Sequence, residues 1–149
     1  MKKITLLIVC ILGVLTGTFA QIHKPVEWTV ASKKLNSKEA VVFIKATIQD
    51  GWHIYSQNVK EGGPIATSFT FGQAADYALH GKTAEPKPVV KHEEVFKMDV
   101  GYFKEEVIFQ QKVILKKGTA TVKGKVEWQA CDATQCLPPD EYNFEVIIK

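Results

Sequence analysis

Apolar and polar side chains alternate along much of this chain, and an alternation with a period of two predicts β-strands. The pattern is clearest over residues 119–130. The apolar face of this segment consists of Ala120, Val122, Gly124, Val126, Trp128 and Ala130. Further strand patterns run over residues 26–30, 40–49, 67–71, 107–115 and 144–148.

The segments between these strands have the composition of turns and loops. Gly81, Pro86 and Pro88 interrupt residues 72–90, which we predict to be irregular with at most one edge strand. Residues 91–101 are predicted to form a loop in which Phe96 stands among charged side chains. About seven or eight short strands without a helical stretch favour an all-β fold, an immunoglobulin-like antiparallel β-sandwich, although the cysteine pair that joins the sheets of true immunoglobulin domains is absent.

The first 20 residues follow the pattern of a cleavable secretory signal peptide. Two lysines precede an apolar run from Ile4 to Leu15, and small residues lead to Ala20. The run is shorter than the roughly 20 apolar residues that a transmembrane helix needs. We therefore predict a signal peptide at 1–20, one β-sandwich domain at 21–149, a periplasmic or secreted location, and no membrane-embedded part after cleavage.

Charge and composition exclude several classes of function. The signal segment removes Lys2 and Lys3, so the predicted mature chain carries 17 basic residues against 16 acidic ones. Without arginine or a basic stripe interleaved with aromatic residues, nucleic acid is not an expected partner. The sequence has no evident hydrolase constellation or phosphate-binding loop, and we expect no cofactor.

Two cysteines remain after the signal segment removes Cys10. Cys131 and Cys136 lie between two predicted strands, which places them in a loop at the tip of a hairpin. An exported protein meets an oxidising compartment where disulfides persist. This loop is therefore the part of the sequence where we expect the chemistry of the protein, if it has any, to take place.

Three roles for the cysteine pair remain open on the residues alone. A structural disulfide would stabilise so short a loop by only about 2 kcal/mol, and it would join strands that the hairpin already holds. A dithiol–disulfide couple would need an exposed sulfur; because Asp132 and Asp140 nearby do not favour a thiolate, a partner would supply the attacking thiolate. A metal site would have to recruit His53 and His92, whose spacing is a poor match to zinc motifs.

Three stretches together resemble one known family. Residues 128–140, with both cysteines, resemble the cysteine motif in the periplasmic N-terminal domain of the thiol:disulfide interchange protein DsbD, also called the disulfide bond corrector protein domain. Residues 50–55 (Asp-Gly-Trp-His-Ile-Tyr) are similar to its aromatic segment, and residues 92–96 (His-Glu-Glu-Val-Phe) to its cap loop. The likeness extends from about Pro25 to the C-terminus.

The resemblance implies a function for the cysteine pair. It implies an immunoglobulin-like sandwich that passes reducing equivalents between a thioredoxin-like donor and exported acceptor proteins. Cys136 would form the mixed disulfide with the donor, and Cys131 would resolve it. No thioredoxin domain follows Lys149, so we expect the donor to be a separate protein. Whether the protein is an enzyme, a protein-disulfide oxidoreductase, is left open at this point.

The same resemblance implies roles for four further residues. Phe96 would cover the disulfide until a partner displaces it, and Glu94 matches an acidic residue beside the cysteines. Tyr55 and His53 would line the site, with His53 standing where relatives often carry tyrosine. The alternative is a secreted binding module for carbohydrate or protein, in which a structural disulfide supports a loop that displays Trp52 and Tyr55.

Overall fold

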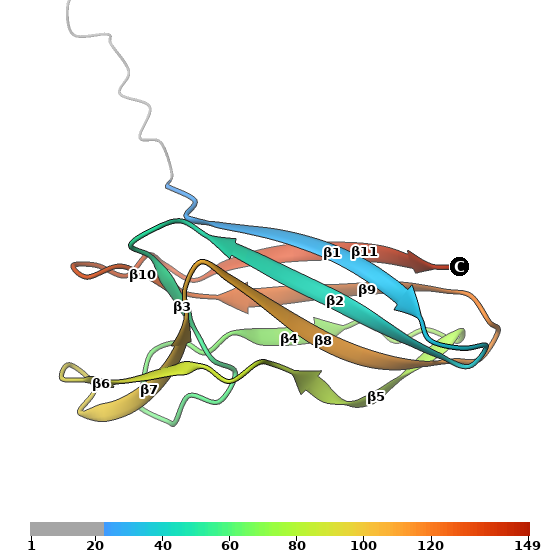
Figure 1. Ribbon diagram of the computed structural model, residues 1–149, viewed down its shortest axis with the longest axis horizontal. Coiled ribbons are helices and arrows are strands. Elements are labelled where there is room, and N and C mark those ends of the chain that lie inside the picture. The colour runs from blue at the N-terminus through green and yellow to red at the C-terminus, as the bar shows by residue number, and fades with distance from the viewer. Residues whose placement is uncertain (1–22) are drawn as a thin grey trace, which may run out of the picture.

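The computed structural model describes residues 23–149, and every regular element in that part of the chain is a β-strand (Figure 1). The predicted signal peptide, residues 1–20, lies outside the described residues. No helix between residues 23 and 149 is long and apolar enough to cross a membrane.

The described residues form three antiparallel sheets. The first sheet has the order β1 (Val26–Lys34), β2 (Glu39–Ile48), β8 (Glu106–Leu115) and β5 (Tyr77–Ala84). The second has the order β11 (Asp140–Ile148), β9 (Ala120–Trp128) and β4 (Ser68–Phe71). The third consists of short strands in the order β10 (Ala130–Cys131), β3 (His53–Tyr55), β7 (Met98–Phe103) and β6 (Val89–Glu93).

The first two sheets enclose the main hydrophobic core, which gives the predicted sandwich. Phe109 of β8 is fully buried, with its ring centroid 4.8 Å from that of Phe69, 5.7 Å from that of Phe103 and 6.1 Å from that of Trp28. The alternation seen in the sequence accounts for this core, since successive side chains of a strand point to opposite faces. The immunoglobulin-like β-sandwich expected from the sequence is therefore confirmed.

The third sheet lies at one end of the sandwich, where β10, β3, β6 and β7 gather at the left of Figure 1. Its strands β3 and β10 continue from the long strands: β3 follows β2 after a turn at Asp50–Gly51, and β10 follows β9 after Gln129. The predicted strand at 119–130 is thus divided between two sheets. This division carries Cys131 away from the main core.

The prediction of a loop at residues 91–101 is wrong. β6 and β7 form a hairpin there, and its turn, residues 94–97, is closed by a hydrogen bond from the Phe96 amide to the Glu93 carbonyl. Residues 72–90 hold β5 and the start of β6, and the described chain has eleven strands instead of seven or eight. The sequence of β6 does not predict a strand because β6 is an edge strand with four of its five residues exposed, and it therefore lacks an apolar alternation.

Glu85, directly after β5, connects the sandwich to the end sheet. Its carboxylate accepts hydrogen bonds from the Ser56 hydroxyl, the Gln57 backbone amide at 2.9 Å and the Asn58 side-chain amide at 2.8 Å. These donors belong to the segment that follows β3. Hydrogen bonds to a charged acceptor are stronger than neutral ones, so this residue fixes the exit of β3.

Candidate functional site

The described structure joins Cys131 and Cys136 by a disulfide, with their Cα atoms 4.0 Å apart. The loop between them turns on Asp132, whose carboxylate accepts bonds from the Thr134 amide (2.7 Å), the Thr134 hydroxyl (2.9 Å) and the Gln135 amide (2.8 Å). The same hydrogen bonds lower the pKa of Asp132. The loop therefore has its own hydrogen-bonded frame in addition to the disulfide.

The two cysteines differ sharply in their access to solvent. Cys131 is 1% exposed and belongs to a small buried cluster with Tyr55 and Val100, whereas Cys136 is exposed. The difference follows from position, because Cys131 is the last residue of β10 and Cys136 stands in the loop beyond it. A thiolate from another protein can therefore reach the disulfide far more readily at Cys136.

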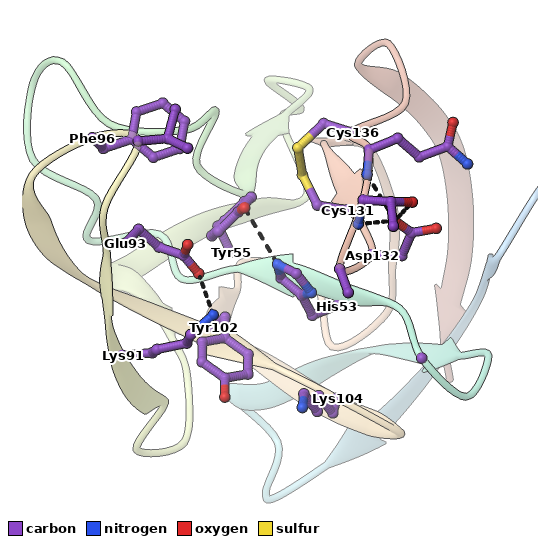
Figure 2. A pocket seen from close by; sticks show the side chains of 15 residues that line it. His53, Tyr55, Lys91, Glu93, Phe96, Tyr102, Lys104, Cys131, Asp132 and Cys136 are labelled. Atoms are coloured by element: carbon purple, nitrogen blue, oxygen red, sulfur yellow. Dashed lines mark hydrogen bonds and ion pairs between the residues drawn. A yellow bond between two sulfur atoms is a disulfide. The ribbon is translucent and has the colours of Figure 1, made fainter.

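The disulfide forms one wall of an open pocket of about 450 Å³ (Figure 2). The pocket is lined by Gly51, His53, Tyr55, Lys91, Glu93, Val95, Phe96, Tyr102, Lys104, Cys131, Asp132, Ala133, Thr134, Gln135 and Cys136. The lining combines aromatic rings with both signs of charge. The structure thus brings five of the six sequence-predicted site residues to one cavity.

His53 and Tyr55 form the floor of the pocket on β3. His53 is the register partner of Cys131 across the β10–β3 ladder, and its Nε2 atom lies 3.3 Å from the Tyr55 hydroxyl oxygen. Its ring also packs edge-on against Tyr102 of β7, with centroids 5.2 Å apart. Burial lowers the pKa of His53, and burial with the nearby Glu93 raises the pKa of Tyr55.

The opposite wall comes from the β6–β7 hairpin. Phe96 of its turn lines the pocket across from the disulfide in Figure 2, and Lys91 and Glu93 of β6 form an ion pair at 3.4 Å. Glu94 does not line the pocket and is exposed. Because alternate residues of a strand share a face, Lys91 and Glu93 point inward, and Glu94 begins the turn. The acidic side chain of the hairpin that lines the pocket is therefore Glu93 and not Glu94.

The alternatives raised from the sequence find little geometric support. His92 pairs with Asp99 at 2.9 Å on the exposed side of the hairpin and does not line the pocket. No group of three or more potential metal ligands occurs among residues 23–149. Trp52 is 8% exposed and Tyr55 is 3% exposed, so neither is displayed as a platform for a sugar or a protein.

Among the lining residues that the sequence did not assign to the site, four come from one region of the fold: Lys91, Glu93, Tyr102 and Lys104. All four belong to β6, β7 or the residue that follows β7. For Lys91 and Glu93 the available signal is their spacing by two, which places both side chains on one face of a strand; Tyr102 and Lys104 have no such local signal.

Comparison with known proteins gives a consistent result. The sequence model of a family described as "Thiol:disulfide interchange protein DsbD, N-terminal" matches residues 22–147. No match is found among curated proteins.

Three solved structures have a similar fold. The N-terminal periplasmic domain of ScsB from Proteus mirabilis has a TM-score of 0.59 at 16% identity, over 83% of this chain and 46% of the other. The Neisseria meningitidis DsbD N-terminal domain in the reduced form has a TM-score of 0.50 at 19% identity, over 78% and 82%. The complex of the DsbD and PilB N-terminal domains from the same organism has a TM-score of 0.55 at 18% identity, over 84% and 87%. This chain spans about half of the ScsB chain.

Proposed function

The chain belongs to the family of N-terminal domains of the thiol:disulfide interchange protein DsbD, and we propose that it is a thiol–disulfide exchange module with Cys131 and Cys136 as its redox couple. Electrons pass from a thioredoxin-like donor to this couple and from the couple to exported acceptor proteins. The proposed location is the periplasm or the exterior, reached through cleavage of residues 1–20. In this sense the protein acts as a protein-disulfide oxidoreductase.

One observation carries the proposal: a disulfide with one exposed and one buried cysteine forms the wall of an open pocket. A structural disulfide does not need to be accessible to the thiolate of another protein. A bond that only joins the two sides of the cysteine loop would stabilise a closed loop equally well. Exchange requires that an attacking sulfur approach one cysteine in line with the bond. The pocket at Cys136 supplies that approach.

The exchange runs in two balanced steps. A thiolate of the donor attacks Sγ of Cys136, the Cys131–Cys136 bond breaks, and the Cys131 sulfur leaves as a thiolate that takes up a proton. The second donor thiolate then attacks the donor sulfur of the mixed disulfide and releases Cys136 as a thiolate. The donor ends as a disulfide, and this protein holds two thiols and the electron pair. Transfer to an acceptor disulfide is the reverse sequence.

A related domain gives the proposal a precedent for partner binding. The solved Neisseria complex contains a DsbD N-terminal domain together with a PilB N-terminal domain. For this chain we propose partners of thioredoxin-like type on both sides of the exchange. The rim of the pocket, with exposed Val95 beside Phe96, is the proposed contact surface.

The test compares the two cysteines one at a time. In the Cys131→Ala variant, Cys136 is converted to a mixed disulfide with thionitrobenzoate and mixed with a thioredoxin whose second active-site cysteine is replaced by alanine. We expect rapid release of thionitrobenzoate and a reductant-sensitive covalent adduct. The matched variant, Cys136→Ala with the same label on Cys131, should react far more slowly because Cys131 is buried.

Two results would contradict the proposal. Equal or faster reaction at Cys131 would refute the assignment of Cys136 as the sulfur that the donor thiolate attacks. Absence of an adduct at Cys136, or a reduction potential of the oxidised protein well below about −300 mV, would indicate a structural disulfide. In that case the Cys131→Ala/Cys136→Ala double variant should lose about 2 kcal/mol of stability and no function.

A further inference from the structure

His53 lies directly opposite Cys131 in the end sheet. The two residues are direct register partners in the antiparallel β10–β3 pair, and both line the pocket. Directly opposed residues of such a pair point to the same face, with Cβ atoms roughly 4.5–5.5 Å apart. The imidazole therefore stands beside the sulfur that must gain and lose a proton during exchange (Figure 2).

Bulk water has little access to that sulfur. Cys131 is 1% exposed and packs against Tyr55 and Val100. A buried thiol cannot hand its proton directly to solvent, and burial disfavours the thiolate. A proton acceptor inside the pocket would remove this obstacle to the return attack of Cys131.

The other described polar groups around His53 are poorly suited to that task. The Asp132 carboxylate is engaged by three hydrogen bonds from its own loop, and Glu93 is paired with Lys91. Carboxylates are also weaker bases than imidazole. Tyr55 retains its proton, since burial raises its pKa.

The charges that act on His53 come from three neighbouring segments. Glu93 and Lys91 belong to β6, Lys104 follows β7, and Asp132 lies in the cysteine loop. Burial, Lys104 and Lys91 lower the pKa of His53, while Glu93 and Asp132 act in the opposite direction. The net direction is downward, so the ring is neutral near pH 7 and free to accept a proton.

We propose that His53 is the general base that accepts the Cys131 thiol proton when Cys131 resolves a mixed disulfide on Cys136. The proposal deepens the exchange function and rests on it. The hydrogen bond to the Tyr55 hydroxyl fixes the ring. In the tautomer in which Nε2–H donates to that hydroxyl, Nδ1 is the nitrogen that receives the proton.

The proposed step is balanced in atoms and electrons. The S–H bond of Cys131 breaks and an N–H bond forms on His53. The Cys131 thiolate attacks Sγ of Cys136, the Cys131–Cys136 bond forms, and the bond from Cys136 to the partner sulfur breaks. The partner sulfur, a cysteine sulfur of a thioredoxin-like protein, leaves as a thiolate with the electron pair of the broken bond. In the reverse reaction the imidazolium returns its proton to the Cys131 sulfur.

The experiment uses a small disulfide in place of a protein partner. The reduced mature protein reacts with 5,5′-dithiobis(2-nitrobenzoate), which labels the exposed Cys136 and releases one thionitrobenzoate. Attack by Cys131 then releases the second, and its rate is followed by absorbance across a range of pH. In the unchanged protein the second rate should rise through an inflection below pH 6.5, the ordinary value for histidine.

The His53→Gln variant should lose this inflection and slow the second release by roughly tenfold to a hundredfold near pH 7, at the low end of what a positioned base contributes. The first release should not change. At alkaline pH, where Cys131 is already ionised, the variant and the unchanged protein should converge. His92→Gln, which removes an exposed histidine outside the pocket, is the matched control and should behave like the unchanged protein.

Two outcomes would overturn the role of His53. Slowing by the same factor at every pH would show that the ring only supports the site's structure, and an unchanged profile would show that it does not take part. Because no protein partner is present, these results are independent of the thioredoxin experiment. If the thioredoxin experiment fails but the second release of thionitrobenzoate shows the expected dependence on pH and on His53, the proposed protein partners are refuted and the role of His53 as base is not.

Discussion

The sandwich and the end sheet of this molecule are built differently. The sandwich has strands of up to ten residues and a continuous core of large apolar side chains, whereas the end sheet contains β10 with two residues and β3 with three. The small cluster beside the disulfide has three buried members among the described residues, Tyr55, Val100 and Cys131, whereas the other buried residues of the end sheet, Ile54, Phe103 and Ala130, belong to the main core. Stability therefore belongs mainly to the sandwich, and the reactive bond lies where few contacts hold it.

This separation has a physical consequence for exchange. Reduction of the disulfide removes only a link between Cys131 and Cys136 within the loop that leads to β11. The long ladders of β2 with β8 and of β9 with β11 do not include this link. The site can change its covalent state while the scaffold keeps its structure. Substitutions in the two regions should therefore affect different measurements.

The largest expected effect is on stability, from Phe109→Ala in the sandwich core. Removing this fully buried ring, packed against Trp28 and Phe69, should cost about 3–5 kcal/mol in the free energy of unfolding. Urea unfolding measures the loss. The exchange rate per folded molecule should stay unchanged, and Ile108→Ala on the exposed face of β8 is the control. A large change in disulfide reactivity of the folded variant would break the separation of the two regions.

The next effect concerns the connection between the regions. Glu85→Gln keeps the shape of the side chain but removes the charge that accepts bonds from Ser56, Gln57 and Asn58, so we expect a loss of about 1–2 kcal/mol. Glu61→Gln, an exposed change in the following loop, should stay within about 0.5 kcal/mol. Thermal unfolding compares the two. Equal stabilities would mean that the Glu85 hydrogen bonds contribute nothing net.

The third effect is on the rate at which the disulfide is reduced, with almost no change in the free energy of unfolding. If the turn closes Phe96 over the disulfide in about 90% of molecules, Phe96→Ala should speed reduction by a small thiol roughly tenfold. Val95→Ala, at an 85% exposed position of the same turn, is the control. Pseudo-first-order reduction by dithiothreitol gives both rates. An unchanged rate for Phe96→Ala would refute shielding, which is so far a prediction from family resemblance.

The sequence predicted the sandwich well and the site only in part, and the reason is the same difference between regions. In β9 burial on one face imposes an alternation, so the sequence alone assigns Val122 and Val126 to the inner face. In the edge strand β6 no face is buried, so its sequence predicts a loop instead of a strand. The cysteines and His53 follow from motifs, whereas the place of Tyr102 in the site depends on the pairing of β7 with β3, which no local pattern encodes.

The smallest expected effect is a pH dependence of stability that comes from His53. Its folded-state pKa is depressed by burial, so between that value and the unfolded value of 6.5 the unfolded chain binds more protons. The neutral ring therefore favours the folded state fully above pH 6.5, and this contribution is lost as pH falls through the folded pKa. Because the ring is half-buried, the contribution is small.

The measurement is the difference in melting temperature of the oxidised protein between about pH 7.5 and about pH 5, on either side of the histidine range. His53→Gln should reduce this difference, and His92→Gln should leave it unchanged, since His92 is exposed. Asp132 and Glu141, whose pKa values are lowered, lose their charge only at more acidic pH and do not interfere. A larger loss of stability at low pH in His53→Gln than in the unchanged protein would show that the ring is not held neutral in the folded state, and the role of His53 as base would lose its electrostatic support.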